Sequence, residues 1–473
     1  MAWARREAMR LRPLPIALFL FALAAGAEEW TRFRGPNGSG VSNDTGFPIE
    51  FGREKNLLWR TPVRPGKSSP VLTRHHIFLT AFENGKLFTQ CFDRETGKLL
   101  WERWVERPRA ESTEASNHPA AITAVTDGEN VYSFFMDYGL ISYDPGGNVR
   151  WKAPLGPFSN SMGHSSSPIL AGDNIILVID QALDSYIAGF DRGNGQIRWK
   201  TPRKEIDGWA TPLVYQPAGT APVVLTTSSG QLGAHLVDNG KRLWSRAGLS
   251  PVIVASPILE KDTVFTFGYG FDAMSPFADQ LQKFDKNHDG KLSPDEYGND
   301  PDLIGIGQFS GNKDGIVTQE KWDEHQRTTL APSSLVAIRL DGNSEAQGRE
   351  LWRYQKSFVG VVPSPLFYNG VLYLLKNGGL LTSFDAETGK VAKAGRLAGA
   401  LGGYSASPVA AEGKLFLASE EGKVTVVKAA REWEVVAIND LGEGCFATPA
   451  LAGGQIYLRT SEALYCFGRV RGE

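Results

Sequence analysis

Short runs of apolar residues, separated by turns rich in Gly and Asp, recur along most of this 473-residue chain. The stretch CFDRETGKLLW, Cys91–Trp101, sets the pattern: an apolar strand, a turn whose last residue is Gly97, and a second strand that ends at Trp101. Glycine supplies the backbone freedom that such a turn needs. Related stretches end at Trp151, Trp199, Trp244 and Trp352, and weaker ones lie near Ala392 and at Trp433. Seven matches at similar spacing predict internal repeats, in which each Trp packs against the neighbouring repeat.

A second pattern gives the number of repeats. A proline, preceded in most cases by Ser or Thr, opens a short apolar run at Pro70, Pro119, Pro168, Pro212, Pro257, Pro365, Pro408 and Pro449. Successive positions lie 41–49 residues apart, except for one gap of 108 residues that holds an insertion. This period is typical of a four-stranded propeller blade, and a proline at the start of a strand removes no ladder hydrogen bond. We therefore predict an all-β, eight-bladed β-propeller of four-stranded blades.

The two ends of the repeat region complement each other. The segment Leu57–Trp59 has the pattern of a fourth strand without its first three, whereas Pro449–Phe467 supplies three strands and lacks a fourth. Pairing them removes two open sheet edges, so we expect strand 56–60 to close the ring. The predicted organisation is a signal peptide at 1–27, an extended leader at 28–55 packed on the propeller surface, propeller segments at 56–270 and 334–473, and a small α-helical insertion in blade five at 271–333.

The N-terminus has the pattern of an export signal. Four arginines, at positions 5, 6, 10 and 12, precede the apolar run 16–25, and Ala25-Gly26-Ala27 is a small-residue cleavage site. We predict cleavage after Ala27 and a periplasmic or secreted protein. The apolar run is too short for a transmembrane anchor.

Charge and cysteine content narrow the function classes. The formal net charge is −2, and no dense basic run is present, which argues against nucleic acid as a partner. An exported protein with Cys91, Cys445 and Cys466 can form one disulfide. Cys445 with Cys466 is the favoured pair, because both lie in the last blade; three buried thiols are the alternative.

The insertion carries the sharpest chemical motif. The segment 285–296 reads DKNHDGKLSPDE and matches the EF-hand calcium loop at its diagnostic positions. Side-chain oxygens are expected from positions 1, 3 and 5, a backbone carbonyl from position 7, and a bidentate carboxylate from position 12. The predicted Ca²⁺ ligands are therefore Asp285, Asn287, Asp289, Lys291 and Glu296, with Ser293 at position 9 acting through water and Gly290 making the turn. A solvated acidic loop is the alternative.

A second, altered loop follows. The segment Phe309–Trp322 aligns without a gap to Phe284–Tyr297, but position 1 is Ser310 and position 12 is Lys321. A cation in place of the bidentate carboxylate predicts weak or no Ca²⁺ binding. We expect this loop to be structural, with Val317 pairing with Leu292 between the two loops.

The repeats DRETGKLLW, YDPGGNVRW and DRGNGQIRW resemble those of the pyrroloquinoline-quinone (PQQ)-type eight-bladed propellers, and the leader FRGPNGSG is similar to leaders in that group. The resemblance implies the fold over nearly all of the chain outside the insertion. One branch contains PQQ-dependent alcohol and glucose dehydrogenases, which hold the quinone near the propeller axis with Ca²⁺ and an Asp base. The other includes a non-enzymatic outer-membrane assembly lipoprotein that binds partners. The chain lacks the adjacent cysteines and the haem motif of the first branch and the lipid-anchoring Cys of the second.

Polar residues gather in the loops that join one blade to the next: Asn117-His118, 160–164 with His164, Trp209 and Tyr404. Blade geometry places these loops on one face, together with the insertion, and loops on a rigid scaffold are where sites usually lie. His118 and His164 are candidate ligands or proton carriers, with loop histidines whose hydrogen bonds are satisfied locally as the alternative. Asp180-Gln181 ends a strand that could face the axis, and it suggests no chemistry of its own.

These observations predict an exported calcium-binding β-propeller that acts as a non-catalytic binding or scaffolding module. Its partner is expected to be a protein or a small ligand on the inter-blade loop face, and the chain to be a monomer. The alternative is a PQQ-dependent oxidoreductase. A hydrolase or a carbohydrate binder is a third possibility, but the sequence has no nucleophile elbow, zinc signature or phosphate loop.

Overall fold

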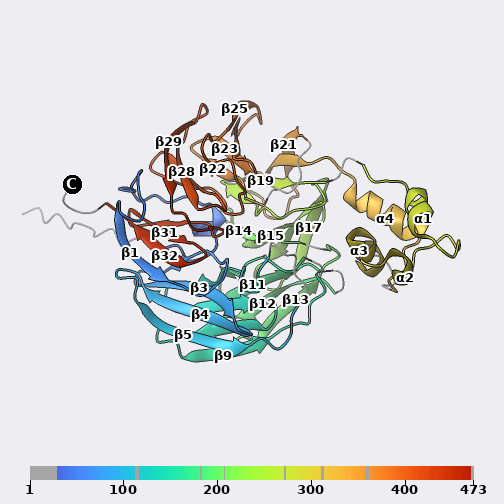
Figure 1. Cartoon of the computed structure of the whole chain (residues 1–473), viewed down its shortest axis with the longest axis horizontal. Coiled ribbons are helices and arrows are strands. Elements are labelled where there is room, and N and C mark those ends of the chain that lie inside the picture. The colour runs from blue at the N-terminus through green and yellow to red at the C-terminus, as the bar shows by residue number, and fades with distance from the viewer. Residues whose placement is uncertain are drawn as a thin grey trace, which may run out of the picture.

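Eight four-stranded antiparallel sheets stand around a common axis in the computed structural model, which confirms the predicted eight-bladed propeller. The colours in Figure 1 pass around the ring from blue through green and orange to red. The structure describes residues 29–111, 117–160, 162–181, 184–206, 208–270, 273–309, 314–356 and 362–469. The predicted signal peptide lies outside the described residues.

Each blade runs from a short inner strand to a longer outer strand. Blade one comprises β2 (Val71–Leu72), β3 (His76–Glu83), β4 (Lys86–Asp93) and β5 (Leu99–Glu106); blade two, β6 (Val125–Thr126), β7 (Val131–Phe135), β8 (Gly139–Tyr143) and β9 (Val149–Pro154). Blade three comprises β10 (Ile169–Ala171), β11 (Asn174–Ile179), β12 (Tyr186–Asp191) and β13 (Ile197–Pro202); blade four, β14 (Leu213–Tyr215), β15 (Val223–Ser228), β16 (Gln231–Leu236) and β17 (Arg242–Ala247).

The second half repeats this order. Blade five comprises β18 (Ile258–Glu260), β19 (Thr263–Gly268), β20 (Ser334–Arg339) and β21 (Arg349–Gln355); blade six, β22 (Leu366–Tyr368), β23 (Val371–Lys376), β24 (Leu380–Asp385) and β25 (Val391–Arg396). Blade seven comprises β26 (Val409–Ala411), β27 (Lys414–Ala418), β28 (Lys423–Lys428) and β29 (Glu434–Asp440); blade eight, β30 (Ala450–Ala452), β31 (Gln455–Arg459), β32 (Ala463–Phe467) and β1 (Leu57–Pro62).

Blade eight is built from both ends of the repeat region. β1 pairs antiparallel with β32, with Thr61 opposite Leu464. In Figure 1 the blue β1 lies beside the red β31 and β32. The outer strand of this sheet, β1, is therefore the segment that the sequence predicted to close the ring.

Tryptophans join the blades, as predicted from the repeats. The Trp101 ring packs on Gly147 of the next blade so closely that a Cβ there would lie 2.6 Å from the ring, and the φ of Gly147 is +78°. The indole Nε1 donates to the carbonyl of Pro145 at 2.8 Å. Trp59, Trp151, Trp199 and Trp352 have the same relation to the turn glycines Gly97, Gly195, Gly240 and Gly389. The turn glycine of each of these blades thus contacts the Trp of the preceding blade.

The first part of the leader does not pack on the propeller surface, as the sequence analysis expected, but enters the space enclosed by the inner strands. The backbone of Trp30 pairs with Leu72 of β2, and Val41 pairs with Ala410 of β26. The 3₁₀ turn η1 (Pro36–Gly38) lies between these contacts. Inner strands leave one edge unpaired, and the leader satisfies part of that edge, which explains why an unrepetitive segment is buried. The last part of the leader does follow the outside of the propeller, where Phe51 and Arg53 bond to Asn439 of β29 and to Leu441.

Two arginines of the leader are buried without a salt bridge to any described residue. The Arg32 guanidinium donates to the carbonyl of Pro212 at 2.6 Å, and Arg34 donates to that of Pro365 at 2.8 Å. Burial lowers the pKa of each guanidinium to about 9. Both therefore remain charged at neutral pH and hold the leader to blades four and six.

The insertion forms a helical lobe between β19 and β20, and it projects from the ring in Figure 1. Its helices are α1 (Phe277–Phe284), α2 (Pro294–Tyr297), α3 (Pro301–Phe309) and α4 (Gln319–Thr329). The lobe has its own core, made by Phe277, Leu292, Tyr297, Leu303, Ile306, Val317 and Trp322. The predicted pairing of Leu292 with Val317 is present as an antiparallel bridge.

The three cysteines are buried free thiols, so the favoured Cys445–Cys466 disulfide is wrong and the alternative is right. Cys466 lies in β32 opposite Trp59, whereas the Cys445 thiol donates to the Arg459 carbonyl at 3.3 Å. Two cysteines that belong to the same blade are therefore not necessarily in contact. In the described part of the chain, no helix has the length and apolar character required to cross a membrane.

Candidate binding face and acidic loop

A closed ring of hydrogen bonds surrounds the propeller axis. One hydroxyl residue from each blade takes part, and its backbone N–H donates to the side-chain oxygen of the equivalent residue in the next blade. The bonds are 2.9–3.2 Å long. The members, in order, are Ser69, Thr123, Ser167, Thr211, Ser256, Ser364, Ser407 and Thr448. Thr448 donates back to Ser69, so this axial ring also joins blade eight to blade one.

The sequence contains a signal for this ring. It is the Ser or Thr that stands beside the prolines from which the strand starts were predicted. In seven blades the ring residue is the Ser or Thr directly before the repeated proline, and a residue before proline is held extended. In blade two the proline assignment was wrong. The ring residue there is Thr123, which precedes Ala124, and Pro119 lies in the preceding loop. Hydroxyl identity, not proline, is the feature common to all eight blades.

The axial ring forms the wall of a cavity of about 280 Å³ on the inter-blade loop face. All eight ring residues line it, and each hydroxyl oxygen already accepts one N–H. No described group accepts a hydrogen bond from these hydroxyls, so their O–H groups are available as donors. The other lining residues include Phe33 of the leader, Trp209, Tyr269, Phe446 and Lys67. The cavity thus combines hydroxyl donors with aromatic surface.

Three of the loop residues selected from the sequence meet at this cavity. Asn117, Met162 and Trp209 line it. The Asn117 amide donates to the carbonyl of Met162 at 2.9 Å, and the Trp209 indole donates to that of Gly163 at 2.9 Å. These bonds tie the loops of blades one to four together, so the mouth of the cavity is held in shape by its own polar groups.

The other selected residues lie outside the cavity lining. His118 accepts the Ala120 N–H at 3.1 Å, and Tyr404 donates to the Ala400 carbonyl at 2.7 Å. His164 is 1% exposed, and neither ring nitrogen has a partner in the described part of the chain. Burial lowers the pKa of His118 and of His164 to about 4. Both imidazoles are therefore neutral at pH 7. His118 has a backbone partner, as a satisfied loop histidine would, whereas His164 has none in the described part of the chain.

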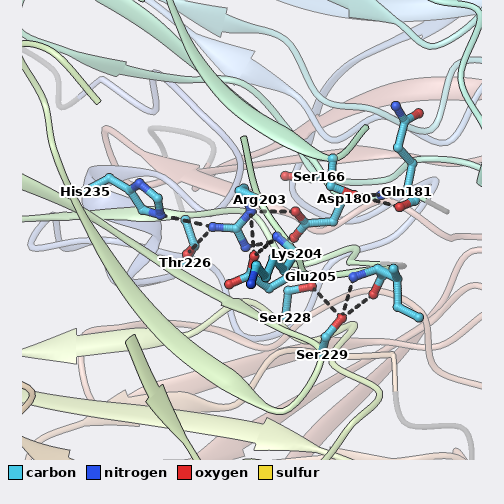
Figure 2. A network of polar contacts seen from close by, with 12 residues as sticks. Ser166, Asp180, Gln181, Arg203, Lys204, Glu205, Thr226, Ser228, Ser229 and His235 are labelled. Carbon is cyan, nitrogen blue, oxygen red and sulfur yellow. Dashed lines mark hydrogen bonds and ion pairs between the residues drawn. The ribbon is translucent and has the colours of Figure 1, made fainter. Parts of the chain in front are cut away.

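Asp180 does not face the axial cavity but belongs to a buried ion-pair network. Figure 2 shows its carboxylate against Arg203, which bonds to both oxygens at 2.6 and 3.0 Å. The same guanidinium reaches Thr226 and, at 3.2 Å, the Nε2 of His235. Burial and the Arg203 charge lower the pKa of His235 to about 3. All these groups are satisfied by each other, so the network joins blades three and four.

The cavity does not fit a Ca²⁺–quinone pair. Ca²⁺ takes oxygen ligands and favours carboxylates, and the described lining contains no carboxylate and only one charged side chain, Lys67. Glu420 is bonded to Ser405, which lines the cavity, but Glu420 itself does not. The hydroxyls at the axis are already held in the axial ring. We derive no quinone chemistry from this arrangement.

The acidic loop of the insertion is folded by its own side chains. Asp285 Oδ2 accepts the Gly290 N–H at 3.0 Å, and Asn287 Oδ1 accepts the Asp289 N–H at 2.9 Å. Asp289 Oδ1 accepts the Lys291 N–H at 2.9 Å. Gly290 has a φ of +77°, as the sixth position of such a loop requires. The three side chains at positions 1, 3 and 5 are therefore oriented by bonds within the loop.

One oxygen of this loop has no partner. Asp285 Oδ1 is buried and accepts no hydrogen bond from a described group. A buried carboxylate oxygen without a partner is costly, and a cation would relieve that cost. Glu296 Oε2 instead accepts the N–H and hydroxyl of Ser293, at 2.9 and 2.8 Å, and caps α2. In the described chain no three acidic, His or Cys side chains converge as a preformed metal cluster.

The fold and the axial ring define the class of protein as an eight-bladed β-propeller. The chain belongs to the family described as "Outer membrane protein assembly factor BamB", whose model matches residues 52–182, 90–274 and 334–473. The match omits 275–333, which is the helical lobe. No match is found among curated proteins.

Two solved structures share the fold at low sequence identity, and a third matches with a TM-score below 0.5. BamB from Moraxella catarrhalis is 12% identical with a TM-score of 0.54, over 87% of this chain and all of that one. The computationally designed Ika8 protein is 10% identical with a TM-score of 0.54, over 89% of this chain and all of that one. The quinohemoprotein alcohol dehydrogenase from Comamonas testosteroni is 12% identical with a TM-score of 0.44, over 95% and 82% of the two chains.

Proposed function

We propose that the chain is an exported, calcium-loaded binding module that holds a protein partner on its inter-blade loop face. The axial cavity is the observation on which this proposal rests. Each hydroxyl oxygen accepts one scaffold N–H and keeps its O–H free to donate, and the described lining has no acid–base pair for catalysis. Donors beside aromatic rings suit a partner segment that presents carbonyl oxygens and an apolar side chain. A protein partner also agrees with the assembly factor that gives the family its description.

Calcium has a place in this proposal as a brace of the helical lobe. The unpartnered Asp285 oxygen, together with Asn287, Asp289 and the Lys291 carbonyl, supplies hard oxygen ligands. Glu296 completes the set if its carboxylate leaves the Ser293 cap. An exported protein meets high Ca²⁺ concentrations, so an affinity on the order of 10⁻⁴–10⁻³ M suffices.

Titration calorimetry of the metal-free mature protein tests the calcium site. We expect one Ca²⁺ per chain, and Glu296→Gln should weaken binding at least about 10-fold because the bidentate ligand is lost. Glu320→Gln removes an exposed acid of the same lobe and should leave the affinity unchanged. Equal affinities for the parent and Glu296→Gln would show that the acidic loop is not the site.

Titration calorimetry also distinguishes the non-catalytic binding module from the PQQ-dependent oxidoreductase. Titration with pyrroloquinoline quinone, with and without Ca²⁺, should give no heat of binding, since the lining offers no carboxylate to hold a metal–quinone pair. Tight binding at one site per chain would contradict the non-catalytic proposal and favour the oxidoreductase.

Site-specific photo-crosslinking in the exporting cell tests the binding face. A photoreactive residue at Met162, which lines the cavity, should give a discrete crosslinked protein that excess unlabelled protein suppresses. Val149, on the outer strand β9, is the control because its exposure of 48% matches the 49% of Met162. Equal crosslinking at both positions, or at neither, would contradict the proposed face.

A further inference from the structure

The altered second loop of the lobe contains a cation of its own. The Lys321 ammonium donates to Asp314 Oδ1 at 2.8 Å and to the backbone carbonyl of Ile316 at 2.8 Å. The Lys321 side chain is 9% exposed, whereas that of Asp314 is 39% exposed. A buried ammonium with a carboxylate partner makes charge-assisted bonds that are stronger than neutral ones.

The two oxygens that Lys321 contacts have equivalents in the first loop. In the gapless alignment of the loops, Asp314 occupies position 5 and Ile316 position 7, where the first loop has Asp289 and Lys291. Those positions supply a carboxylate and a carbonyl to Ca²⁺ in an intact loop. Lys321 itself stands at position 12, where Glu296 stands in the first loop. Lys321 therefore replaces the bidentate carboxylate, and its ammonium contacts two of the oxygens that would otherwise be Ca²⁺ ligands.

The second loop is coupled to the first through several contacts. The N–H groups of Leu292 and Val317 donate to each other's carbonyls at 2.9 and 2.8 Å. Tyr297, the residue that follows Glu296, donates its hydroxyl hydrogen to the Gly315 carbonyl at 2.5 Å. Phe277 of α1 packs on Trp322 of α4 with ring centroids 5.5 Å apart. The described part of the second loop is therefore packed against the residues that flank the first.

We propose that the Lys321 ammonium is a built-in substitute for the second Ca²⁺ and keeps the lobe folded when no metal is bound. This inference rests on the proposed function only in that the first loop takes the single Ca²⁺. The lobe is then a pre-ordered, one-metal brace and not a switch that folds on metal binding. Its second half is insensitive to the calcium concentration around the protein.

The test compares Lys321→Met with the parent in full-length mature protein under a calcium chelator. Near-ultraviolet circular dichroism and limited proteolysis report on the lobe. The parent should be resistant to cleavage within 273–309 and 314–330, whereas Lys321→Met should be cleaved there at least about 10-fold faster, because the Asp314 and Ile316 oxygens lose their cation. Lys283→Met, at an exposed lysine of α1, should behave like the parent.

Lys321→Glu separates a lost cation from a general folding defect. It restores a carboxylate at position 12, so we expect a chelator-sensitive lobe that Ca²⁺ restores to parental resistance, with two Ca²⁺ bound per chain at millimolar concentration. Parental resistance of Lys321→Met in chelator, or a Lys321→Glu lobe that Ca²⁺ does not restore, would overturn the inference. A parent that binds no Ca²⁺ would overturn the proposed calcium site, whereas the chelator comparison would still decide the role of Lys321.

Discussion

At the scale of single residues, the repeats are held together by a contact whose two partners belong to different blades. Gly147 has a left-handed backbone, and the Trp101 ring covers it where a Cβ would stand. Glycine is needed there for two independent reasons, one conformational and one steric. The sequence shows only that a Gly precedes each Trp by a few residues, although the Gly in fact contacts the Trp of the preceding blade.

The two reasons can be separated by substitution. Gly85 has a φ of +75°, and a Cβ on this residue would have no neighbouring atom within 4 Å. Gly147 has a similar φ of +78°, but a Cβ on it would lie 2.6 Å from the Trp101 ring. We expect Gly85→Ala to cost about 1 kcal/mol from backbone strain alone. Gly147→Ala should cost about 2–4 kcal/mol, since overpacking is added. Urea denaturation measures both, and equal costs would show that the Trp contact adds nothing.

At the scale of elements, the propeller has two segments that do not follow its repeat, and they differ in how they are attached. The leader makes backbone bonds to inner strands of several blades and is part of the core. The helical lobe has a core of its own and is inserted between β19 and β20 of blade five. A Cβ at Gly270 would lie 2.1 Å from the Ala331 carbonyl oxygen, so the chain enters and leaves the insertion at neighbouring points.

This attachment predicts that the lobe can be removed. Joining Gly270 to Ala331 through Asn-Gly replaces 271–330 by a hairpin turn and keeps Tyr269 at the cavity. We expect a folded propeller whose melting temperature lies within about 3 °C of the parent, because β19 and β20 keep their full register. Thermal unfolding followed by circular dichroism measures this. Insoluble protein, or a much larger decrease, would show that the lobe supports the ring.

How far the sequence predicted these elements depends on whether they repeat. The spacing of prolines and tryptophans predicted eight blades, and the unpaired pattern at Leu57–Trp59 predicted the outer strand of blade eight. The leader has no periodicity, so nothing in Arg32 or Arg34 showed that the segment lies inside the ring. The axial ring was missed because Ser and Thr were treated as neighbours of proline and not as the repeated feature. Cys445 and Cys466 show that sharing a blade does not imply contact.

At the scale of the whole molecule, the fold buries groups whose ionisation it does not tolerate. His164 and His235 are 1% and 0% exposed, and their pKa values are lowered to about 4 and about 3. The unfolded chain exposes both imidazoles with pKa values near 6.5. As the pH falls, the unfolded state therefore binds protons before the folded state does.

The expected consequence is acid sensitivity. Stability contributed by these imidazoles is complete above about pH 6.5 and is lost as the pH falls towards 4, with a limiting slope of about 1.4 kcal/mol per pH unit for each. Urea denaturation between pH 7.5 and 4.5 should show this slope, and His164→Phe should reduce it. An unchanged slope in His164→Phe would contradict the assignment.

The axial ring has a further consequence at this scale. Its eight N–H···O bonds all point the same way around the axis, so their dipoles form a circulation whose vector sum is close to zero. Every ring residue both donates through its N–H and accepts through its hydroxyl oxygen, so the closed circuit has no terminal member that lacks a partner. A group placed on the axis therefore experiences almost no net field from the amides of the ring, and its charge preference is set by the other residues of the lining, Lys67 among them.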